Sequence, residues 1–288
     1  MKVMFLTLVT VVLLFGSFCV PVYASTNASI PMIRSLQGPS LNRSGYAVSA
    51  QSVTSVSGTF TVPTVSAPGS VNGFPTDVSV WVGIDGYTSG TVEQIGVSGS
   101  FDSSTNTASY SAWWEMYPRV STTIHSMTIS PGDVMAASVT FLASGSFQLS
   151  ITDTTSGQSF SAVERAPVGG PHVAQTNSAE WIVERAATIS KGYITILPLA
   201  TFSQVTFSGA SFVASGNTYS LQYAIDNYAQ YSGFPATAPS QPYWENMFIV
   251  SITPTNTLVQ LDSASAVTSN SFTVSFIDNG VPLPIQRV

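Results

Sequence analysis

Three short segments gather the polar side chains of this sequence that could perform acid–base chemistry, and each places them among aromatic residues. They are Trp81–Gly86 with the nearby Glu93–Gly96, Tyr110–Pro118, and Asn177–Glu184. A carboxylate is costly to bury, so a glutamate inside an aromatic strand either has a partner or serves a site that shifts its pKa. The chemistry open to these segments is therefore that of carboxylates and amides. An exposed or salt-bridged strand glutamate remains the alternative for each one taken singly.

Other catalytic chemistries find little support in the sequence. The two histidines, His125 and His172, have no G-x-S-x-G nucleophile motif to serve, and we interpret both as structural. The single cysteine is Cys19, and no residues show metal-ligand spacing or a phosphate-binding glycine loop. We therefore expect no metal and no cofactor.

Strand parity sorts the candidate side chains, because alternate residues of a strand share a face. In the second segment Trp113, Glu115 and Tyr117 fall on one face, and Trp114 and Met116 on the other. In the third segment the two faces carry Glu180 and Glu184 on one side, and Trp181 and Val183 on the other. A face with Trp, Glu and Tyr at period two can bind an extended peptide or a sugar chain, while the opposite face can fill a core. Parity does not say whether the segments converge.

The elements that must position these residues are short strands. Alternating β-branched runs recur between Gly, Ser, Asn and Pro clusters, for example Val78–Ile84, Phe147–Ile151, Tyr193–Leu197 and Phe272–Phe276. No stretch keeps helical spacing over three turns. The pattern predicts an all-β fold, a two-sheet antiparallel sandwich in one domain with very little helix. Residues 227–243 are too long for a tight turn and should form a surface excursion, either an inert insertion or a functional lid.

Composition excludes further classes of protein. The 288 residues include eight Lys+Arg and fourteen Asp+Glu, only 8% charged, with 44% hydrophobic residues. Such a chain is neither disordered nor a coiled coil, and its scattered basic residues cannot form a nucleic-acid surface. Low charge is also an expected adaptation to acid, because few paired carboxylates would be lost and few cations would remain to repel one another.

The N-terminus has the features of a secretory signal. Met1 and Lys2 precede an apolar run from Val3 to Phe18, and small residues at Val22 and Ala24 suit cleavage after Ala24. An uncleaved membrane anchor is the alternative. We expect residues 1–24 to be a signal peptide, 25–41 a polar tail or short pro-segment, and 42–288 one domain. The mature protein should be extracellular, without membrane attachment, and monomeric.

Taken in order, these segments resemble the glutamic peptidase family G1, the eqolisins. The stretches that carry the resemblance are W-V-G-I-D-G at 81–86, Gln94-x-Gly96, Y-x-A-W-x-E-x-Y-P at 110–118 and A-E-W-I-V-E at 179–184. Weaker similarity covers Ser55–Pro63 and Leu258–Phe276. The resemblance implies a concanavalin-like sandwich, or lectin-like jelly roll, and an acid endopeptidase that acts on polypeptides.

By this resemblance the catalytic pair would be Gln94 and Glu180. The supporting or substrate-binding positions would be Trp81, Asp85, Trp113, Glu115 and Tyr117. One carboxylate can serve in turn as base and acid, and a primary amide can orient water and donate N–H to the oxyanion. Hydrolysis then needs no histidine, thiol or metal.

The sequence departs from the family at several positions. Ser98 and Ser111 stand where members usually carry Asp, and Glu184-Arg185 replaces the usual Glu-Asp. The family's disulfide cysteines are missing, and the short 25–41 segment makes activation by removal of a long pro-domain doubtful. These changes should alter the pH optimum or subsite preference more than abolish activity.

Two other functions stay open on the sequence. A carbohydrate-binding or glycan-cleaving sandwich would pair Glu115 with Glu180, because retaining glycosidases need two carboxyl groups about 5 Å apart. An inactive adhesion protein predicts that Gln94 and Glu180 do not meet. The position of Gln94 relative to Glu180 discriminates among the three.

Overall fold

The protein is a sandwich of two large β-sheets, seen here in a computed structural model that describes residues 39–167, 173–190, 193–231, 241–253 and 257–287. The sheet that carries the candidate residues has ten strands. Its main path is β1 (Pro39–Ser40), β21 (Tyr243–Ile252), β2 (Arg43–Ser49), β14 (Ser178–Glu184), β7 (Asp77–Asp85), β8 (Val92–Asp102), β9 (Thr107–Tyr117) and β10 (Thr122–Ile124), while β20 (Ala229–Gln230) and β22 (Leu258–Gln260) pair with β21. Pairing along β2 to β10 is antiparallel throughout.

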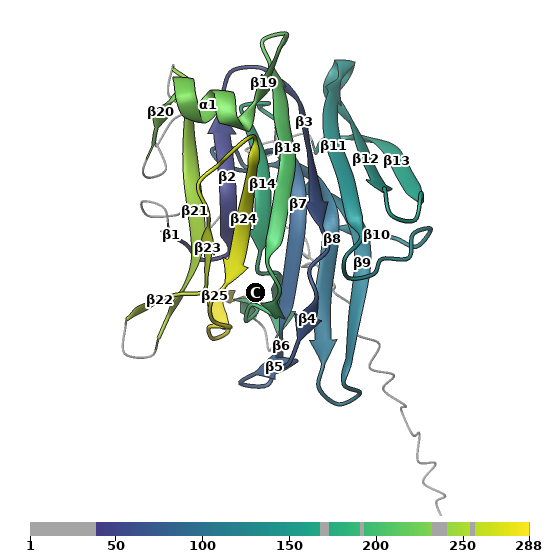
Figure 1. The fold of residues 1–288 in the computed structure, drawn as a ribbon, viewed down its shortest axis with the longest axis vertical. Coiled ribbons are helices and arrows are strands. Elements are labelled where there is room, and N and C mark those ends of the chain that lie inside the picture. The colour runs from purple at the N-terminus through teal and green to yellow at the C-terminus, as the bar shows by residue number, and fades with distance from the viewer. Residues whose placement is uncertain (1–38, 168–172, 191–192, 232–240, 254–256, 288) are drawn as a thin grey trace, which may run out of the picture.

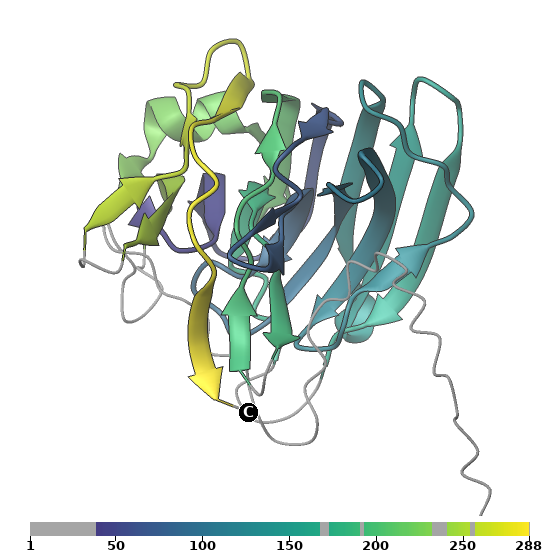
Figure 2. The same ribbon diagram turned by 90° about the horizontal axis from the view of Figure 1, so that it is seen from below.

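The second sheet has eight strands and packs against the first (Figure 1). It consists of β13 (Ser159–Arg165), β12 (Ser146–Asp153), β11 (Val134–Leu142), β3 (Val53–Thr61), β18 (Val205–Ala214), β24 (Ser271–Phe276) and β23 (Asp262–Ala264), with β19 (Asn217–Ser220) paired to β18. Figure 2 looks along the strands, where both layers are seen from below.

Smaller elements complete the described fold. They are the sheet of β15 (Ala187–Ser190), β16 (Tyr193–Ile196) and β25 (Leu283–Arg287), the pairs β17 (Thr201–Phe202) with β4 (Val65–Ser66) and β5 (Ser70–Val71) with β6 (Phe74–Pro75), a 3-10 turn at Ala143–Gly145, and helix α1 (Leu221–Asn227). Ser220 caps α1 by accepting a hydrogen bond from the backbone N–H of Tyr223.

The main hydrophobic core fills the space between the two large sheets, and Trp181 ties them together. Its indole Nε1 donates a 2.8 Å hydrogen bond to the backbone carbonyl of Ser57, on the opposite sheet. The close approach requires a glycine on that strand, because a Cβ at Gly58 would lie 2.9 Å from the indole Cδ1. Val183 and Met116 join this core, as strand parity predicts. The residues at alternate positions are therefore free to build the other face of the sheet.

The predicted all-β sandwich is confirmed, and the four runs cited from the sequence lie on β7, β12, β16 and β24, except that Leu197 follows the end of β16. Within the described residues no helix is long and apolar enough to cross a membrane. The predicted signal peptide and nearly all of the 25–41 segment lie outside the described residues, although Pro39–Ser40 pairs with β21. Much of the predicted 227–243 excursion also lies outside them, at 232–240.

Candidate active site

A single row of residues crosses the ten-stranded sheet on the face that points away from the main core. Glu180 on β14 pairs with Gly83 on β7, and Gly83 pairs with Gln94 on β8. Residues directly opposite one another in antiparallel strands project to the same face. With neighbouring strands about 4.8 Å apart, the backbones of Glu180 and Gln94 are roughly 10 Å apart and separated only by a glycine. The row brings together the two residues predicted as a catalytic pair.

The same row continues on both sides of the pair. Glu115 on β9 lies opposite Gln94, and Ala47 on β2 lies opposite Glu180. Ala47 in turn pairs with Glu245 on β21. Glu115 is thus one strand farther from Glu180 than Gln94 is. Sequence reasoning did not single out Glu245, because its position in the row depends on long-range strand pairing.

Gly83 lets neighbouring groups pack closely over the strand that separates Gln94 from Glu180. A Cβ built at this position would lie 3.0 Å from Cζ3 of Trp81 and 3.2 Å from Cβ of Gln94. It would also lie 3.1 Å from the backbone oxygen of Glu93. A side chain at position 83 would therefore force the neighbouring side chains to shift, and only glycine fits without displacing Trp81 or Gln94.

Gln94 is held from one side and unpartnered on the other. Its Nε2 donates a short hydrogen bond to Oε2 of Glu115. Its Oε1 is buried and has no hydrogen-bond partner among the described residues. Burial raises the pKa of Glu115 to about 8, and the nearby charge of Glu184 adds to the rise. The amide thus keeps an acceptor and its second N–H for another group.

Glu180 is fully buried and ionically paired. Its Oε2 lies 3.1 Å from NH1 of Arg43, and the hydroxyl of Ser178 donates to its Oε1 at 3.3 Å. Burial raises the pKa of Glu180 to about 8, while the guanidinium of Arg43 opposes that rise. The Glu180 carboxyl group therefore loses its proton at a much higher pH than a solvent-exposed glutamate does.

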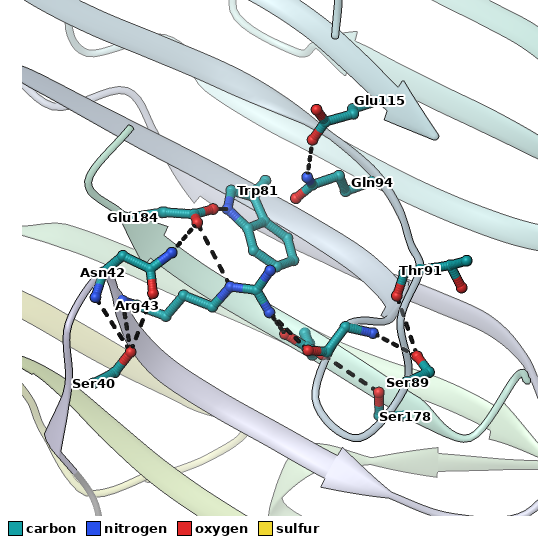
Figure 3. A network of polar contacts seen from close by, with 12 residues as sticks. Ser40, Asn42, Arg43, Trp81, Ser89, Thr91, Gln94, Glu115, Ser178 and Glu184 are labelled. Carbon is teal, nitrogen blue, oxygen red and sulfur yellow. Dashed lines mark hydrogen bonds and ion pairs between the residues drawn. The ribbon is translucent and has the colours of Figure 1, made fainter. Parts of the chain in front are cut away.

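Trp81 and Glu184 form the layer around this ion pair (Figure 3). The indole Nε1 of Trp81 donates a 2.8 Å hydrogen bond to Oε2 of Glu184, and the guanidinium of Arg43 lies 5.1 Å from the centre of the Trp81 ring. Asn42 donates to Oε1 of Glu184 at 2.6 Å. Figure 3 shows Trp81 between Glu184 on one side and Gln94 on the other. Trp81 therefore spaces and orients the charged groups.

Asp85 works through the backbone. Its carboxylate accepts hydrogen bonds from the N–H groups of Gln175, Thr176 and Asn177 at 2.7, 3.0 and 2.9 Å. Asp85 itself has φ +65°, a left-handed conformation that Asp tolerates better than most residues. These bonds fix the segment that leads directly into β14 and hence into Glu180.

Trp113 and Tyr117 lie on the same outer face, with a second apolar cluster that includes Ala47, Trp81, Tyr87, Val92, Ile182, Tyr243 and Met247. Trp113 is nearly buried, and its Nε1 has no hydrogen-bond partner in the described part of the chain. Burial raises the pKa of Tyr117 to about 12. All seven sequence-predicted site residues thus occupy this face or the end of a strand that borders it.

The family's missing carboxylates leave a serine row beside the site. Ser98 pairs with Ser79 on one side and Ser111 on the other, and the Ser79 and Ser98 hydroxyls are 2.7 Å apart. The Ser79 hydroxyl also donates to Oδ1 of Asp77 at 3.4 Å, so the Ser98 hydroxyl is part of a hydrogen-bonded chain of side chains. Searching the described residues reveals no cluster of three or more His, Cys, Asp or Glu side chains that could hold a metal ion.

Two features of the site escaped the sequence reasoning. Arg43 comes from β2, 137 positions before Glu180 in the chain, and no local motif links them. Glu93 was only a member of a polar segment, but its side chain is fully buried and lies close to the side chains of Asp85 and Thr91. Strand parity gives a partial indication for Glu93, because Glu93 shares a strand face with Ile95 and Val97, which belong to the main core.

The sequence and the fold are similar to those of known proteins. The model of the peptidase A4 family matches residues 41–237. Aspergillopepsin-2 of Aspergillus niger is 32% identical over 195 residues, 62% of this chain and 66% of that protein. Scytalidopepsin B of Scytalidium lignicola is 34% identical over 173 residues, 59% of this chain and 62% of that protein. Each alignment thus spans just under two thirds of the relative's length.

The fold has a solved counterpart. The crystal structure of scytalido-glutamic peptidase with a transition state analog inhibitor superposes with a TM-score of 0.62 at 24% identity, covering 82% of this chain and 98% of that one. This likeness establishes the sandwich fold. Because the family model spans more than half of the sequence, the chain belongs to the peptidase A4 family, the G1 glutamic peptidases or eqolisins.

Proposed function

We propose that the chain is a secreted endopeptidase that works in acid and hydrolyses peptide bonds with Gln94 and Glu180. The observation that carries this proposal is the row Glu180–Gly83–Gln94 across three adjacent strands. Its central residue carries no side chain, and we place the attacking water and the peptide carbonyl at this position, between the amide of Gln94 and the carboxyl group of Glu180. The predicted signal peptide at 1–24 accounts for export, and polypeptides are the substrates.

Water attack requires proton transfer at both ends of the reaction. Burial raises the pKa of Glu180 to about 8, so in acid the free enzyme holds a proton on this carboxyl. Glu180 donates that proton to the carbonyl oxygen as water attacks the carbonyl carbon. The carboxylate so formed takes a proton from the attacking water and passes it to the leaving nitrogen as the C–N bond breaks. A hydroxyl proton of the collapsing tetrahedral intermediate then returns to Glu180, which leaves a carboxylic acid and an amine as products. Atoms and charge balance over the cycle, and Glu180 returns to its starting state.

Gln94 orients the water and stabilises the tetrahedral intermediate. Its unpartnered Oε1 can accept a hydrogen bond from the water. One N–H is engaged by Glu115, which fixes the amide plane and leaves the second N–H for the oxygen on which charge develops. Glu115 is therefore a positioning group for Gln94.

The alternative, a glycan-cleaving site, is less well supported by the strand order. It would need Glu115 and Glu180 to act as the carboxyl pair, but Gly83 and Gln94 lie between them in the row. Glu115 instead serves as the hydrogen-bond partner of Gln94.

The test is cleavage of casein or denatured haemoglobin by the mature protein between pH 2 and 6. Glu180→Gln and Gln94→Ala should each lower kcat by at least about 100-fold, the usual effect of losing an acid–base group or an oxyanion donor. Glu164→Gln on β13 and Gln148→Ala on β12 are matched controls on the other sheet and should retain activity.

An aspartic-peptidase inhibitor tests for contamination by a pepsin-like enzyme. Cleavage by this protein should be insensitive to the inhibitor. An inactive parent, or normal cleavage by either site variant, contradicts the proposal. Activity on glycans in place of proteins would support the alternative.

A further inference from the structure

Arg43 makes direct contact with the carboxyl group proposed to perform the chemistry. Its NH1 lies 3.1 Å from Oε2 of Glu180, and its Nε lies 3.6 Å from Oε1 of Glu184. NH1 also donates to the backbone oxygen of Gly86 at 3.1 Å, and the guanidinium lies over the ring of Trp81. One planar group is thus fixed by a strand, a loop and an aromatic face.

The position of Arg43 limits its motion. It lies on β2 directly opposite Glu184 of β14, so its side chain must run along the sheet to reach Glu180, which is on the same strand as Glu184. Its side chain is only 15% exposed, and that of Glu180 is fully buried. An exposed ion pair of this kind would contribute little to stability. Removing one partner of a buried pair is costly, because the other charge is left buried and unpaired.

The other ionisable groups around the pair are acidic in the described part of the chain. They are Glu184 on β14, Asp85 on β7, Glu115 and Tyr117 on β9, Tyr87 in the loop after β7, and Glu245 on β21. Of these groups, Glu184 and Asp85 disfavour a negative charge on Glu180. Arg43 acts against both, and its own pKa is raised by Glu184 and Glu180 despite burial, so it stays charged.

We propose that Arg43 is a positioning residue of the reaction, which holds the Glu180 carboxyl beside Gly83 and sets the pH range in which the site works. The proposal rests on the proposed function, because it assigns Arg43 a role through Glu180. Arg43 does not touch the gap over Gly83 in any described contact, so it acts on the substrate only through the carboxyl group.

The direction of its effect follows from electrostatics. A cation at hydrogen-bond distance favours the carboxylate form and typically lowers the pKa of a carboxyl group by about 1 to 3 units. Without Arg43, Glu180 keeps its proton to higher pH. The limb of the kcat–pH profile that reports the titration of Glu180 must then move to higher pH. Glu184 disfavours a negative charge on Glu180, so without Glu184 the same limb must move to lower pH.

The experiment compares Arg43→Gln, Arg43→Lys and Glu184→Gln with the parent. For each, kcat and KM are measured against pH, and the Glu180 carboxyl is titrated by 13C NMR, its signal assigned by its loss in Glu180→Gln. Arg119→Gln is the matched control, because it removes the same charge from an exposed position whose guanidinium donates to the carbonyl of Arg165.

We expect Arg43→Gln to move the Glu180 titration and the corresponding kcat limb upward by at least one unit. Arg43→Lys keeps the charge but loses the planar fork, so its shift should be smaller. Glu184→Gln should move both downward, and Arg119→Gln should move neither. Because Arg43→Lys and Glu184→Gln keep the geometry more nearly intact, they decide the question if Arg43→Gln does not fold.

An unchanged Glu180 titration in both Arg43 variants would overturn the role of Arg43, even in an active enzyme. The NMR titration does not need activity. A parent without peptidase activity would therefore refute the proposed function while the pairing of Arg43 with Glu180 is still measured.

Discussion

Substituting Gly83 by alanine should separate the chemistry of the site from its stability. The new Cβ would lie between Gln94 and Glu180, at 3.0 Å from Cζ3 of Trp81 and 3.2 Å from Cβ of Gln94. It would also meet the backbone oxygen of Glu93 at 3.1 Å. Such distances are short by a few tenths of an ångström, so the two side chains must shift. The methyl group also occupies the space assigned to water.

The stability cost should be moderate. Overpacking a well-packed position costs about 1–3 kcal/mol, and replacing glycine recovers about 0.4–1 kcal/mol by restricting the unfolded chain. The free energy of unfolding of Gly83→Ala should therefore fall by about 0–2.6 kcal/mol. In contrast, displacement of catalytic groups by a fraction of an ångström to 1 Å can reduce the rate by about 100-fold. We expect a kcat loss of that order with a folded protein.

The assay is casein cleavage at the acid optimum together with urea unfolding at the same pH. Gly99→Ala is the matched control on the same strand as Gln94, because its Cβ would also lie 3.0 Å from side-chain atoms, Cε1 of Tyr110 and Cγ1 of Val65, but away from the row. Gly99→Ala should show a similar stability loss and near-parental kcat. If Gly83→Ala keeps more than about a third of the parental kcat, the position over Gly83 is not where water is activated.

Three further predictions concern stability and loop order. Burial raises the pKa of Glu93 well above its ordinary value, so its protonated form stabilises the fold below pH 4.5, and that stability is lost as pH rises through the raised folded pKa. Glu93→Gln should thus raise the urea midpoint at pH 7 and leave it unchanged at pH 3.5, whereas an equal effect at both values would contradict this. Trp181→Phe removes the 2.8 Å hydrogen bond to the Ser57 carbonyl and should lower the free energy of unfolding by about 1–3 kcal/mol, measured by urea denaturation; an unchanged midpoint would show that the bond adds nothing. Asp85→Asn places an amide against three N–H donors, so hydrogen exchange at residues 175–177 should accelerate and kcat should fall, and unaltered exchange would argue against the anchoring role.

Much of the fold could be predicted because its information is local. Alternation of β-branched and polar residues defines strands such as β7 and β24, and parity alone separates Trp181 from Glu180. The candidate site was predicted only in part. Gln94 and Glu180 were identified by family resemblance, while their common face follows from strand pairing that no window of sequence contains.

Local sequence patterns define the type of each strand face and show how scarce charge is. Pairing of distant strands in the folded protein determines which of the few charged side chains meet. Glu180 could have faced Glu115, as a glycan-cleaving site requires, but the strand order places Gly83 and Gln94 between them. Arg43 reaches Glu180 from β2, and Glu93 is buried close to Asp85. Neighbour relations in a sheet depend on pairing between distant segments, and electrostatic interactions depend on those distances and on burial, so neither can be read from local periodicity.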